Sequence, residues 1–364
     1  MKLFNQQKLK RLKALAPLLL VLRLLRLIFL PVAWLARLRK RPDFLVADGF
    51  LIGDCVLLRP MIAAMLREGR VVYLGGSHAR EILWDMDVTF ETFQWPWANY
   101  NYSIRKLLGL IGLWFRILIL QPRTIVEPRG DVRSLAFLYL TCPRRLAGFS
   151  FTGGHFMLDV DPELSEVVHL EEHNRVLSKS LGLRYSIEDM FCAPEPGNGS
   201  VAISFSGSQP LRAMPTNVAL ALLGRLKSLG VNMSYLKGPG DFFLKNPENL
   251  AVVAKFNIPI LEGTFSAYIN ALKNASGYVG MDSGGGHLAA MMQKPSIIFF
   301  STQHSWYCGP RGKDTQAVET DEILECRPCA GITCTNERYL RCLEIPDARL
   351  QQVVYEFKQK LDRA

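Results

Sequence analysis

The first 41 residues of this 364-residue chain contain no aspartate or glutamate, although the whole chain has 33 acidic residues. Short internal repeats and low-complexity tracts are also lacking, so the sequence gives no sign of a repeat architecture. Apolar residues make up 49% of the chain, and this composition does not fit a disordered chain or a coiled coil. The length is sufficient for two domains of ordinary size, each with its own core.

Basic residues outnumber acidic ones and give the chain a formal net charge of +10. This excess favours an anionic partner, which could be nucleic acid, a membrane surface or a phosphorylated substrate. Much of the charge lies in residues 1–41, where a stripe of cations falls within about 120° of a helical projection. The stripe consists of Lys8, Arg11, Arg23, Arg26 and Arg37. Pro17 and Pro31 interrupt its register.

The other faces of this helix are mainly apolar from Leu18 to Ala36. A basic stripe on such a helix is typical of a segment lying in the interface of an anionic membrane, with arginines reaching toward the headgroups. Three alternatives stay open: a spanning helix, which would bury Arg23 and Arg26 in lipid; a cleaved signal peptide, for which no convincing cleavage site follows; and a helix packed on the protein's own core. Nucleic-acid binding is disfavoured because the charge lies on an apolar helix rather than in a basic groove with aromatic residues.

Short apolar runs alternate with helical patterns beyond residue 41. In the first half we expect strands over residues 44–47, 71–74 and 124–126, with helices over about 55–67 and from 132. The Pro/Gly-rich stretch APEPGNGS (193–200) resembles a linker. After it we expect strands over 201–206, 231–236, 258–261, 278–281 and 296–300, with helices over about 216–229, 249–255, 267–275 and 287–292. This alternation predicts an α/β protein with two Rossmann-like domains facing across a cleft, and ligands at the carboxyl ends of the strands.

Each predicted domain contributes one polar turn to that cleft. Asp54 follows the segment GFLIG at the start of a helix, where it could be an N-cap or a catalytic carboxylate. In the second half, the segment SFSGSQPLRAMP places Ser206 and Gly207 in a turn with Arg212 nearby. Hydroxyls, free N–H groups and a guanidinium can together hold a diphosphate without a metal, although a solvated loop would have the same composition.

Three consecutive glycines, 284–286, stand in the segment GYVGMDSGGGHLAAMMQKPSIIFF (277–300). Each lowers helix propensity by roughly 1 kcal/mol relative to alanine, yet we expect a helix directly after them. Glycines at a turn from strand to helix let a ligand approach backbone N–H groups, and the helix dipole favours negative charge there. The neighbouring Asp282, Ser283 and His287 favour a phosphate site over a tight packing corner.

The same segment resembles the D-[ST]-G-x-x-H-L-A-A motif of glycosyltransferase family 9, the bacterial ADP-heptose:lipopolysaccharide heptosyltransferases, which have the GT-B fold. Similar segments follow the family's order: FLIGDCVLLRPMIAAML, RGDVRSLAFLYLTCPRRLAGF and HLEEHNRVLSKSLGL. The resemblance covers about Asp43 to the C-terminus. It implies an acceptor domain over residues 42–192 and a nucleotide-sugar donor domain over 193–364, preceded by a membrane-associating helix over 1–41.

The resemblance also implies roles for single residues. Asp54 matches the family's catalytic base. The positions implied for donor binding are Ser206, Gly207, Arg212, Asp241, Asp282, Ser283, Gly284, Gly285 and His287. Among these, Arg212 matches a basic residue that faces the donor phosphates, and Asp241 an acidic residue that contacts the donor ribose. Two departures leave the donor's identity open: STQH (301–304) replaces a glycine after the final strand, and GSQPLRAMP differs from the family's GASWP-like spacing.

Half of the eight cysteines cluster near the C-terminus in a C-x2-C-x4-C-x7-C pattern: Cys326, Cys329, Cys334 and Cys342. These residue types suit zinc, but the spacing is tighter than that of the paired CxxC knuckles of a zinc ribbon. A structural metal in the segment 326–342 therefore stays open, and we predict no catalytic metal. Disulfides are disfavoured if the domains face a reducing cytoplasm. The scattered cysteines are predicted to be ordinary core residues: Cys55, Cys142, Cys192 and Cys308.

Taken with the resemblance, these features predict an inverting, metal-independent glycosyltransferase at the cytoplasmic face of a bacterial inner membrane. It would need no cofactor and would move a heptose or related sugar from a nucleotide diphosphate onto the lipopolysaccharide core. Asp54 would take the acceptor's proton, while Arg212, His287 and the glycine turn would stabilise the departing diphosphate. The expected partners are the donor, the core acceptor and an anionic membrane surface, without nucleic acid. The alternatives are another GT-B enzyme with a different donor, a sugar epimerase, or a catalytically inactive membrane scaffold.

Overall fold

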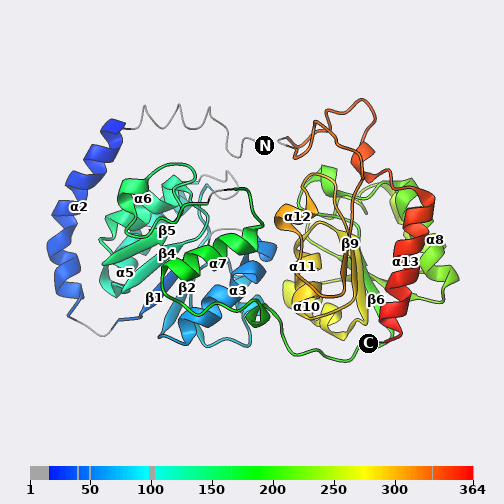
Figure 1. Ribbon diagram of the computed structural model, residues 1–364, viewed down its shortest axis with the longest axis horizontal. Helices are drawn as coiled ribbons and strands as arrows, with labels where there is room; N and C mark the ends of the chain where they lie inside the picture. The colour runs from blue at the N-terminus through cyan, green and yellow to red at the C-terminus, as the bar shows by residue number, and fades with distance from the viewer. Residues whose placement is uncertain are drawn as a thin grey trace. The chain divides into compact units, whose positions relative to one another are not determined.

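The computed structural model describes residues 16–38, 41–48, 51–97, 103–164, 166–329 and 331–363 (Figure 1). Contacts within the chain divide it into two compact units. Unit 1 comprises Met1–Phe50 and Leu57–Asp189, and unit 2 comprises Leu51–Val56 and Met190–Ala364. The first turn of helix α3 (Ile52–Leu66) therefore groups with unit 2.

Unit 1 contains a parallel five-stranded sheet in the order β3-β2-β1-β4-β5. The strands are β1 (Phe44–Ala47), β2 (Val71–Gly75), β3 (Val88–Thr92), β4 (Thr124–Glu127) and β5 (Arg145–Gly148). In the register, Phe44 of β1 pairs with Val71 on one side and with Thr124 on the other. Every residue of β2 and β4 is buried, which is the pattern of strands covered on both faces.

The crossover segments of unit 1 are helical. Besides most of α3 they are α4 (Ala79–Ile82), α5 (Ile104–Leu120), α6 (Val132–Leu140) and α7 (Leu170–Ser180), with 3-10 turns at His155–Met157 and Ile187–Met190. The start of α6 is fixed by Asp131, whose side chain accepts a hydrogen bond from the N–H of Arg133. Apolar side chains of α5 and α6 join those of β1, β2 and β4 in one core.

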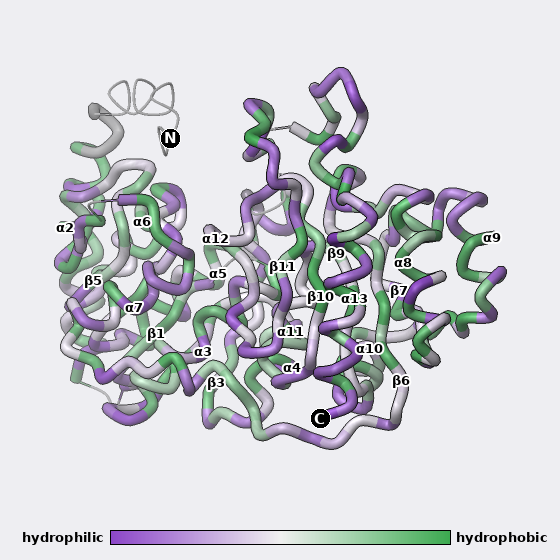
Figure 2. The backbone as a smooth tube through the Cα atoms, turned by 45° about the vertical axis from the view of Figure 1, so that its right-hand side comes forward, coloured by the Kyte–Doolittle hydropathy of each residue, from purple (hydrophilic) through white to green (hydrophobic). Residues whose placement is uncertain are grey.

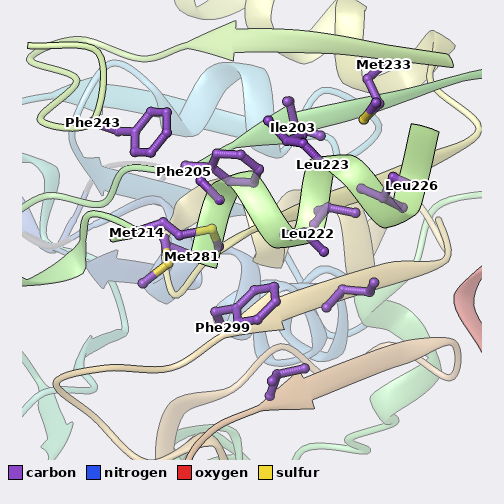
Figure 3. Close-up of a cluster of buried hydrophobic side chains, with 14 of the residues drawn as sticks. Ile203, Phe205, Met214, Leu222, Leu223, Leu226, Met233, Phe243, Met281 and Phe299 are labelled. Atoms are coloured by element: carbon purple, nitrogen blue, oxygen red, sulfur yellow. The ribbon is translucent and has the colours of Figure 1, made fainter. Parts of the chain in front are cut away.

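Unit 2 contains a parallel six-stranded sheet in the order β11-β10-β9-β6-β7-β8. Its strands are β6 (Ser200–Ser204), β7 (Asn232–Lys237), β8 (Ile260–Glu262), β9 (Gly277–Met281), β10 (Ser296–Phe299) and β11 (Thr315–Val318). Its helices are α8 (Thr216–Ser228), α9 (Pro247–Lys255), α10 (Phe265–Asn274), α11 (Gly284–Met291), α12 (Ser305–Cys308) and α13 (Asp347–Leu361), with 3-10 turns at Pro210–Arg212 and Arg341–Leu343. Figure 3 shows the core where Leu222 and Leu226 of α8 meet Ile203 of β6 and Phe299 of β10.

The two parallel sheets confirm the predicted α/β class with two Rossmann-like halves. Most expected strands and helices lie within a few residues of their predicted positions, because buried parallel strands and amphipathic helices have distinct hydrophobic patterns. The glycine segment differs from expectation. Gly284–Gly286 were predicted as a turn before a helix over 287–292, whereas they form the first turn of α11 itself.

The N-terminal helix α2 spans Ala16–Ala36 and packs on α5 and α6 in unit 1. In Figure 2 its trace carries apolar stretches interrupted by polar ones. Two members of the predicted cationic stripe, Lys8 and Arg11, lie outside the described residues. Within the described ranges no helix is both long enough and apolar enough to cross a membrane.

Two arginines of α2 contact aromatic rings of unit 1. The guanidinium carbon of Arg23 lies 5.0 Å from the ring centroid of Phe156, and that of Arg26 lies 4.2 Å from that of Tyr139. Planar cations bind the faces of aromatic rings favourably, so both side chains contact their own unit. Because Arg23 is exposed and Arg26 half-buried, the predicted approach of these arginines to headgroups stays a prediction, and apolar side chains occupy the outer face of the helix.

Candidate donor site in unit 2

The loops at the carboxyl edge of the unit 2 sheet carry the residues predicted to hold the donor. Those after β6 are Ser206, Gly207 and Arg212; Asp241 follows β7; Asp282 and Ser283 follow β9. Because these strands are parallel, their carboxyl ends lie at one edge of the sheet, where α/β proteins bind ligands. The topology therefore brings residues that are distant in sequence to one side of unit 2.

Arg212 connects three of these loops. Its Nη1 lies 3.4 Å from Oδ2 of Asp282, and its Nε donates a 3.0 Å hydrogen bond to Oγ1 of Thr302, which follows β10. Asp282 is only 4% exposed, and its Oδ2 accepts no hydrogen bond from the described residues, because 3.4 Å is long for one. A nearby cation stabilises the ionised form of a buried carboxylate. Arg212 supplies that cation, while its side chain remains 19% exposed at the sheet edge.

The turn after β6 is shaped by internal contacts. The N–H of Gly207 donates a 2.9 Å hydrogen bond to the carbonyl of Arg212, which closes the turn. A Cβ atom on Gly207 would lie 2.6 Å from that of Arg212, so a larger residue does not fit. The Ser206 hydroxyl accepts a 2.8 Å hydrogen bond from the N–H of Phe242 and so ties this turn to the loop after β7. The turn therefore positions the guanidinium.

Asp241 lies on the same edge but is buried, with 5% exposure. Its Oδ2 accepts a 3.0 Å hydrogen bond from the Tyr235 hydroxyl, and its Oδ1 accepts one of 2.9 Å from the N–H of Leu244. Burial raises the pKa of Asp241, and these hydrogen bonds oppose the shift. Both oxygens have partners within unit 2, and the predicted contact with a donor ribose stays a prediction.

Gly285 packs against buried Tyr278 and half-buried Tyr268. A Cβ atom there would lie 2.5 Å from the hydroxyl oxygen of Tyr278 and would also clash with that of Tyr268. Gly285 does not have a positive φ, so backbone conformation does not require glycine at this position. Close packing does. This is the packing-corner alternative that the sequence left open.

The adjacent glycines are restricted in the same way. A Cβ atom on Gly284 would lie 2.7 Å from Cβ of Ile52, and one on Gly286 would lie 2.8 Å from Cδ1 of Ile298. The N-cap of α11 is Ser283, whose side chain makes no capping hydrogen bond. The first N–H groups of α11 are therefore not capped by that side chain, and such a helix terminus favours an anion. Packing and anion binding are compatible functions of this turn.

His287 packs against the first turn of α3, which belongs to unit 2. The imidazole is 7% exposed, and a Cβ atom on Gly53 would lie 2.7 Å from its Cδ2. Asp54 follows directly, as the third residue of α3, and its Oδ2 accepts a 3.2 Å hydrogen bond from the N–H of Leu51. The carboxylate thus caps the helix from its first turn, as in a capping box, and Asp54 is not itself the N-cap residue. It stays partly exposed.

Sequence reasoning missed Thr302 and the tyrosine pair beneath Gly285. The departure at residues 301–304 was the available signal for Thr302.

Cys308, predicted to be an ordinary core residue, lies close enough to the site to be affected by its charges. Burial raises the pKa of the Cys308 thiol to about 12, and the negative charges of Asp282 and Asp54 add to the shift. The thiol is therefore protonated at neutral pH.

Cys326, Cys329, Cys334 and Cys342 are free thiols in the structure. Burial raises the pKa of the Cys329 thiol, and nearby Cys326 and Cys334 raise it further. Among the residues that the structure describes, no group of three or more His, Cys, Asp or Glu side chains is placed to hold a metal ion.

Comparison with known proteins supports the resemblance. Residues 262–340 match the family model described as glycosyltransferase family 9 (heptosyltransferase). A search of curated proteins finds no match. Among solved structures, the E. coli heptosyltransferase WaaC with ADP matches 86% of this chain and 99% of its own at 15% identity, with a TM-score of 0.65.

Two further structures give the same result. The E. coli ADP-heptose lps heptosyltransferase II covers 88% of this chain and 99% of its own at 13% identity, with a TM-score of 0.62. A glycosyl transferase of family 9 from Veillonella parvula covers 90% and 99% at 13% identity, with a TM-score of 0.67. These likenesses confirm the predicted GT-B fold, and the matched segment bears out the predicted resemblance to glycosyltransferase family 9.

Proposed function

We propose that this chain, a glycosyltransferase of family 9 by its matched residues 262–340, transfers a heptose or a related sugar from a nucleotide diphosphate onto a lipopolysaccharide core. The observation that carries the proposal is the placement of Arg212, the α11 N-terminus and His287 in unit 2. Together they offer a guanidinium, backbone N–H groups and an imidazole to an anionic leaving group.

ADP-heptose is the donor that we propose. WaaC, with a similar fold, has been solved with ADP and with ADP-2-deoxy-2-fluoro heptose. In this chain Arg212 would contact the diphosphate, and Asp282 would hold that guanidinium in place. A carboxylate repels phosphate, so the Oδ2 of Asp282 that accepts no hydrogen bond from the described residues would instead accept one from a sugar hydroxyl.

The reaction would be a single displacement with inversion. The acceptor hydroxyl would attack the anomeric carbon, Asp54 would take the hydroxyl proton, and the bond to the nucleotide diphosphate would break. Negative charge grows on the leaving diphosphate, and fixed positive groups stabilise such charge more strongly in the transition state than in the ground state. Arg212, His287 and the α11 N–H groups would fulfil this role without a metal or another cofactor.

The acceptor and the location are part of the proposal. A growing lipopolysaccharide core is membrane-bound, and nucleotide sugars are cytoplasmic, so the enzyme would act as a peripheral protein at the cytoplasmic face of a bacterial inner membrane. The apolar outer face of α2 supports attachment to a membrane.

Incubation of the purified protein with a panel of nucleotide sugars and truncated core lipids, followed by mass spectrometry, tests the proposal. We expect one added heptose and release of ADP in the presence of a chelator. Transfer of another sugar would reassign the donor, and the absence of transfer from every donor would favour the inactive scaffold.

A further inference from the structure

Helices α2 and α5 of unit 1 contact each other and expose apolar side chains. On α2 and just after it these are Leu20, Val21, Leu24, Leu27, Ile28, Val32, Trp34, Leu35 and Leu38, and on α5 they are Ile104, Leu107, Leu108, Ile111, Phe115 and Ile119. Several are well over half exposed, such as Ile28 at 65% and Ile104 at 78%. We call this set the apolar face. An apolar surface of this extent marks an interaction site in a protein that is not aggregated.

The charges on α2 and α5 are all positive, and one of them, Arg116 of α5, pairs with Glu91 of β3 at 3.5 Å. Neither α2 nor α5 contains an acidic residue, whereas α5 begins with Arg105 and Lys106. A surface that combines apolar side chains with an excess of cations complements an anionic bilayer. An acidic protein would satisfy the cations but would not cover so many apolar side chains.

One cavity adjoins the apolar face at the C-terminal half of α2. It has a volume of about 570 Å3 and is lined by Arg26, Leu30, Trp34, Arg37, Leu38, Pro143 and Arg144. The three arginines therefore share the cavity with the apolar side chains of Leu30, Trp34 and Leu38. Trp34 and Leu38 also belong to the apolar face. We call this cavity the arginine pocket.

Neutral acceptors hold two of the arginines in place. Arg37 donates a 2.7 Å hydrogen bond from Nη2 to the carbonyl of Cys142 and one of 3.2 Å from Nε to Oε1 of Gln121. Arg26 donates from Nη2 to the carbonyl of Pro143 at 3.3 Å. These contacts fix the guanidinium groups without neutralising them.

The described residues do not balance the positive charge of the arginine pocket. No carboxylate of the described residues lies within 4.0 Å of the guanidinium nitrogens of Arg26, Arg37 or Arg144. Burial lowers the pKa of Arg37, and the positive charges of Arg144 and Arg26 lower it further. Like charges held together in this way are stabilised by a bound anion.

We propose that the arginine pocket binds the phosphate of an anionic phospholipid while the apolar face inserts into the same membrane. This inference deepens the proposed membrane location and rests on it. The phosphate would accept hydrogen bonds from Arg26, Arg37 and Arg144, for which guanidinium groups have suitable geometry. The acyl chains would run beside Leu30, Trp34 and Leu38 toward the apolar face. A free phosphate would use the cations but would leave this apolar wall exposed.

Flotation of the full-length protein with vesicles tests the site. The vesicles are pure phosphatidylcholine or contain about 30% phosphatidylglycerol, at matched ionic strength. Arg144→Gln should weaken binding to the anionic vesicles by about fivefold, the effect of one charge close to a membrane, without changing binding to phosphatidylcholine. Arg145→Gln is the matched control, because Arg145 is the exposed next residue, carries the same charge and does not line the pocket. It should change binding less than twofold.

Two further measurements separate the contribution of the apolar face from that of the arginine pocket. Ile111→Ser should weaken binding to both kinds of vesicle, because Ile111 belongs to the apolar face and not to the pocket. Inorganic phosphate should not displace the protein from anionic vesicles beyond the effect of chloride at equal ionic strength. Equal losses for the two arginine variants, or displacement by inorganic phosphate, would overturn the lipid site. No donor is present, so a failure of the proposed transferase reaction leaves this readout unaffected.

Discussion

The guanidinium of Arg212 lies 3.4 Å from the carboxylate of Asp282 and donates to Thr302, so one side chain joins the loops that follow β6, β9 and β10. The partly exposed cation is thereby held in one place, and little side-chain entropy remains to be lost on binding an anion. This arrangement makes the contribution of Arg212 measurable by substitution.

Arg212→Ala should weaken binding of a nucleotide diphosphate by roughly 1–3 kcal/mol, the usual scale for hydrogen bonds to charged groups. The free nucleoside should be affected much less. Calorimetry measures both affinities. Arg225→Ala is a control, since Arg225 also forms an ion pair in unit 2, with Asp347 on α13. Unchanged diphosphate affinity in a folded Arg212→Ala protein would remove this residue from the donor site.

His287→Ala should likewise weaken diphosphate binding by roughly 1–3 kcal/mol. The imidazole also packs on Gly53, so the thermal unfolding of the variant must be compared with that of the wild type. His287→Gln retains a hydrogen-bond donor and should recover part of the affinity. If both variants bind ADP normally, His287 has only a packing role.

Asp54→Asn separates capping from catalysis. The amide oxygen can still accept from the N–H of Leu51, so the melting temperature should change little. An amide cannot take a proton from the acceptor, and kcat should fall by about 10²–10⁴-fold with donor affinity nearly normal. Steady-state kinetics with the transfer assay measure this. Full turnover would restrict Asp54 to capping the helix.

Gly285→Ala should destabilise unit 2 by roughly 1–3 kcal/mol, the range for overpacking a core. The new methyl group would clash with the hydroxyls of Tyr268 and Tyr278. Combining it with Tyr268→Phe and Tyr278→Phe removes the clashing oxygens and should recover part of the loss in urea unfolding. Gly238→Ala is the control, since a Cβ atom there meets no atom within 4 Å. No loss for Gly285→Ala would contradict the packing account.

Glu127 predicts a pH dependence of stability in unit 1. Burial raises the pKa of this carboxyl from 4.5 to about 8, and its Oε2 accepts a 2.6 Å hydrogen bond from the N–H of Gly130. A raised carboxyl pKa means that the folded state binds the proton more tightly, so its contribution is complete below about pH 4.5 and is lost as the pH rises through about 8.

Glu127→Gln should therefore flatten the stability profile of unit 1 between these limits, where the wild type loses on the order of 1 kcal/mol per pH unit. The amide can keep the contact with Gly130. Urea unfolding at several pH values measures the profile, and Glu163→Gln, at an exposed position, should leave it unchanged. Parallel profiles for wild type and Glu127→Gln would show that the carboxyl is already ionised in the folded protein.

Much of the fold could be predicted because its signals are local. The buried run of β2 and the amphipathic pattern of α8 carry their own periodicity, and their predicted bounds agree with Val71–Gly75 and Thr216–Ser228 to within a residue. Parallel pairing then follows from the alternation of strands and helices. The motif that contains Asp282 and His287 was likewise recognisable without coordinates, as the family match over residues 262–340 bears out.

The order of the elements, the α/β class and the resemblance to family 9 could therefore be recognised without coordinates. The tertiary structure alone decided which atoms face one another. Local sequence does not decide which aromatic ring Arg26 contacts, and only the packing of α2 on α6 brought Tyr139 to it. In the same way Gly285 could serve a ligand or a tight contact, and the contact became visible only when α10 placed Tyr268 beside it. Helical periodicity specifies a face, whereas the partner of that face depends on residues distant in sequence.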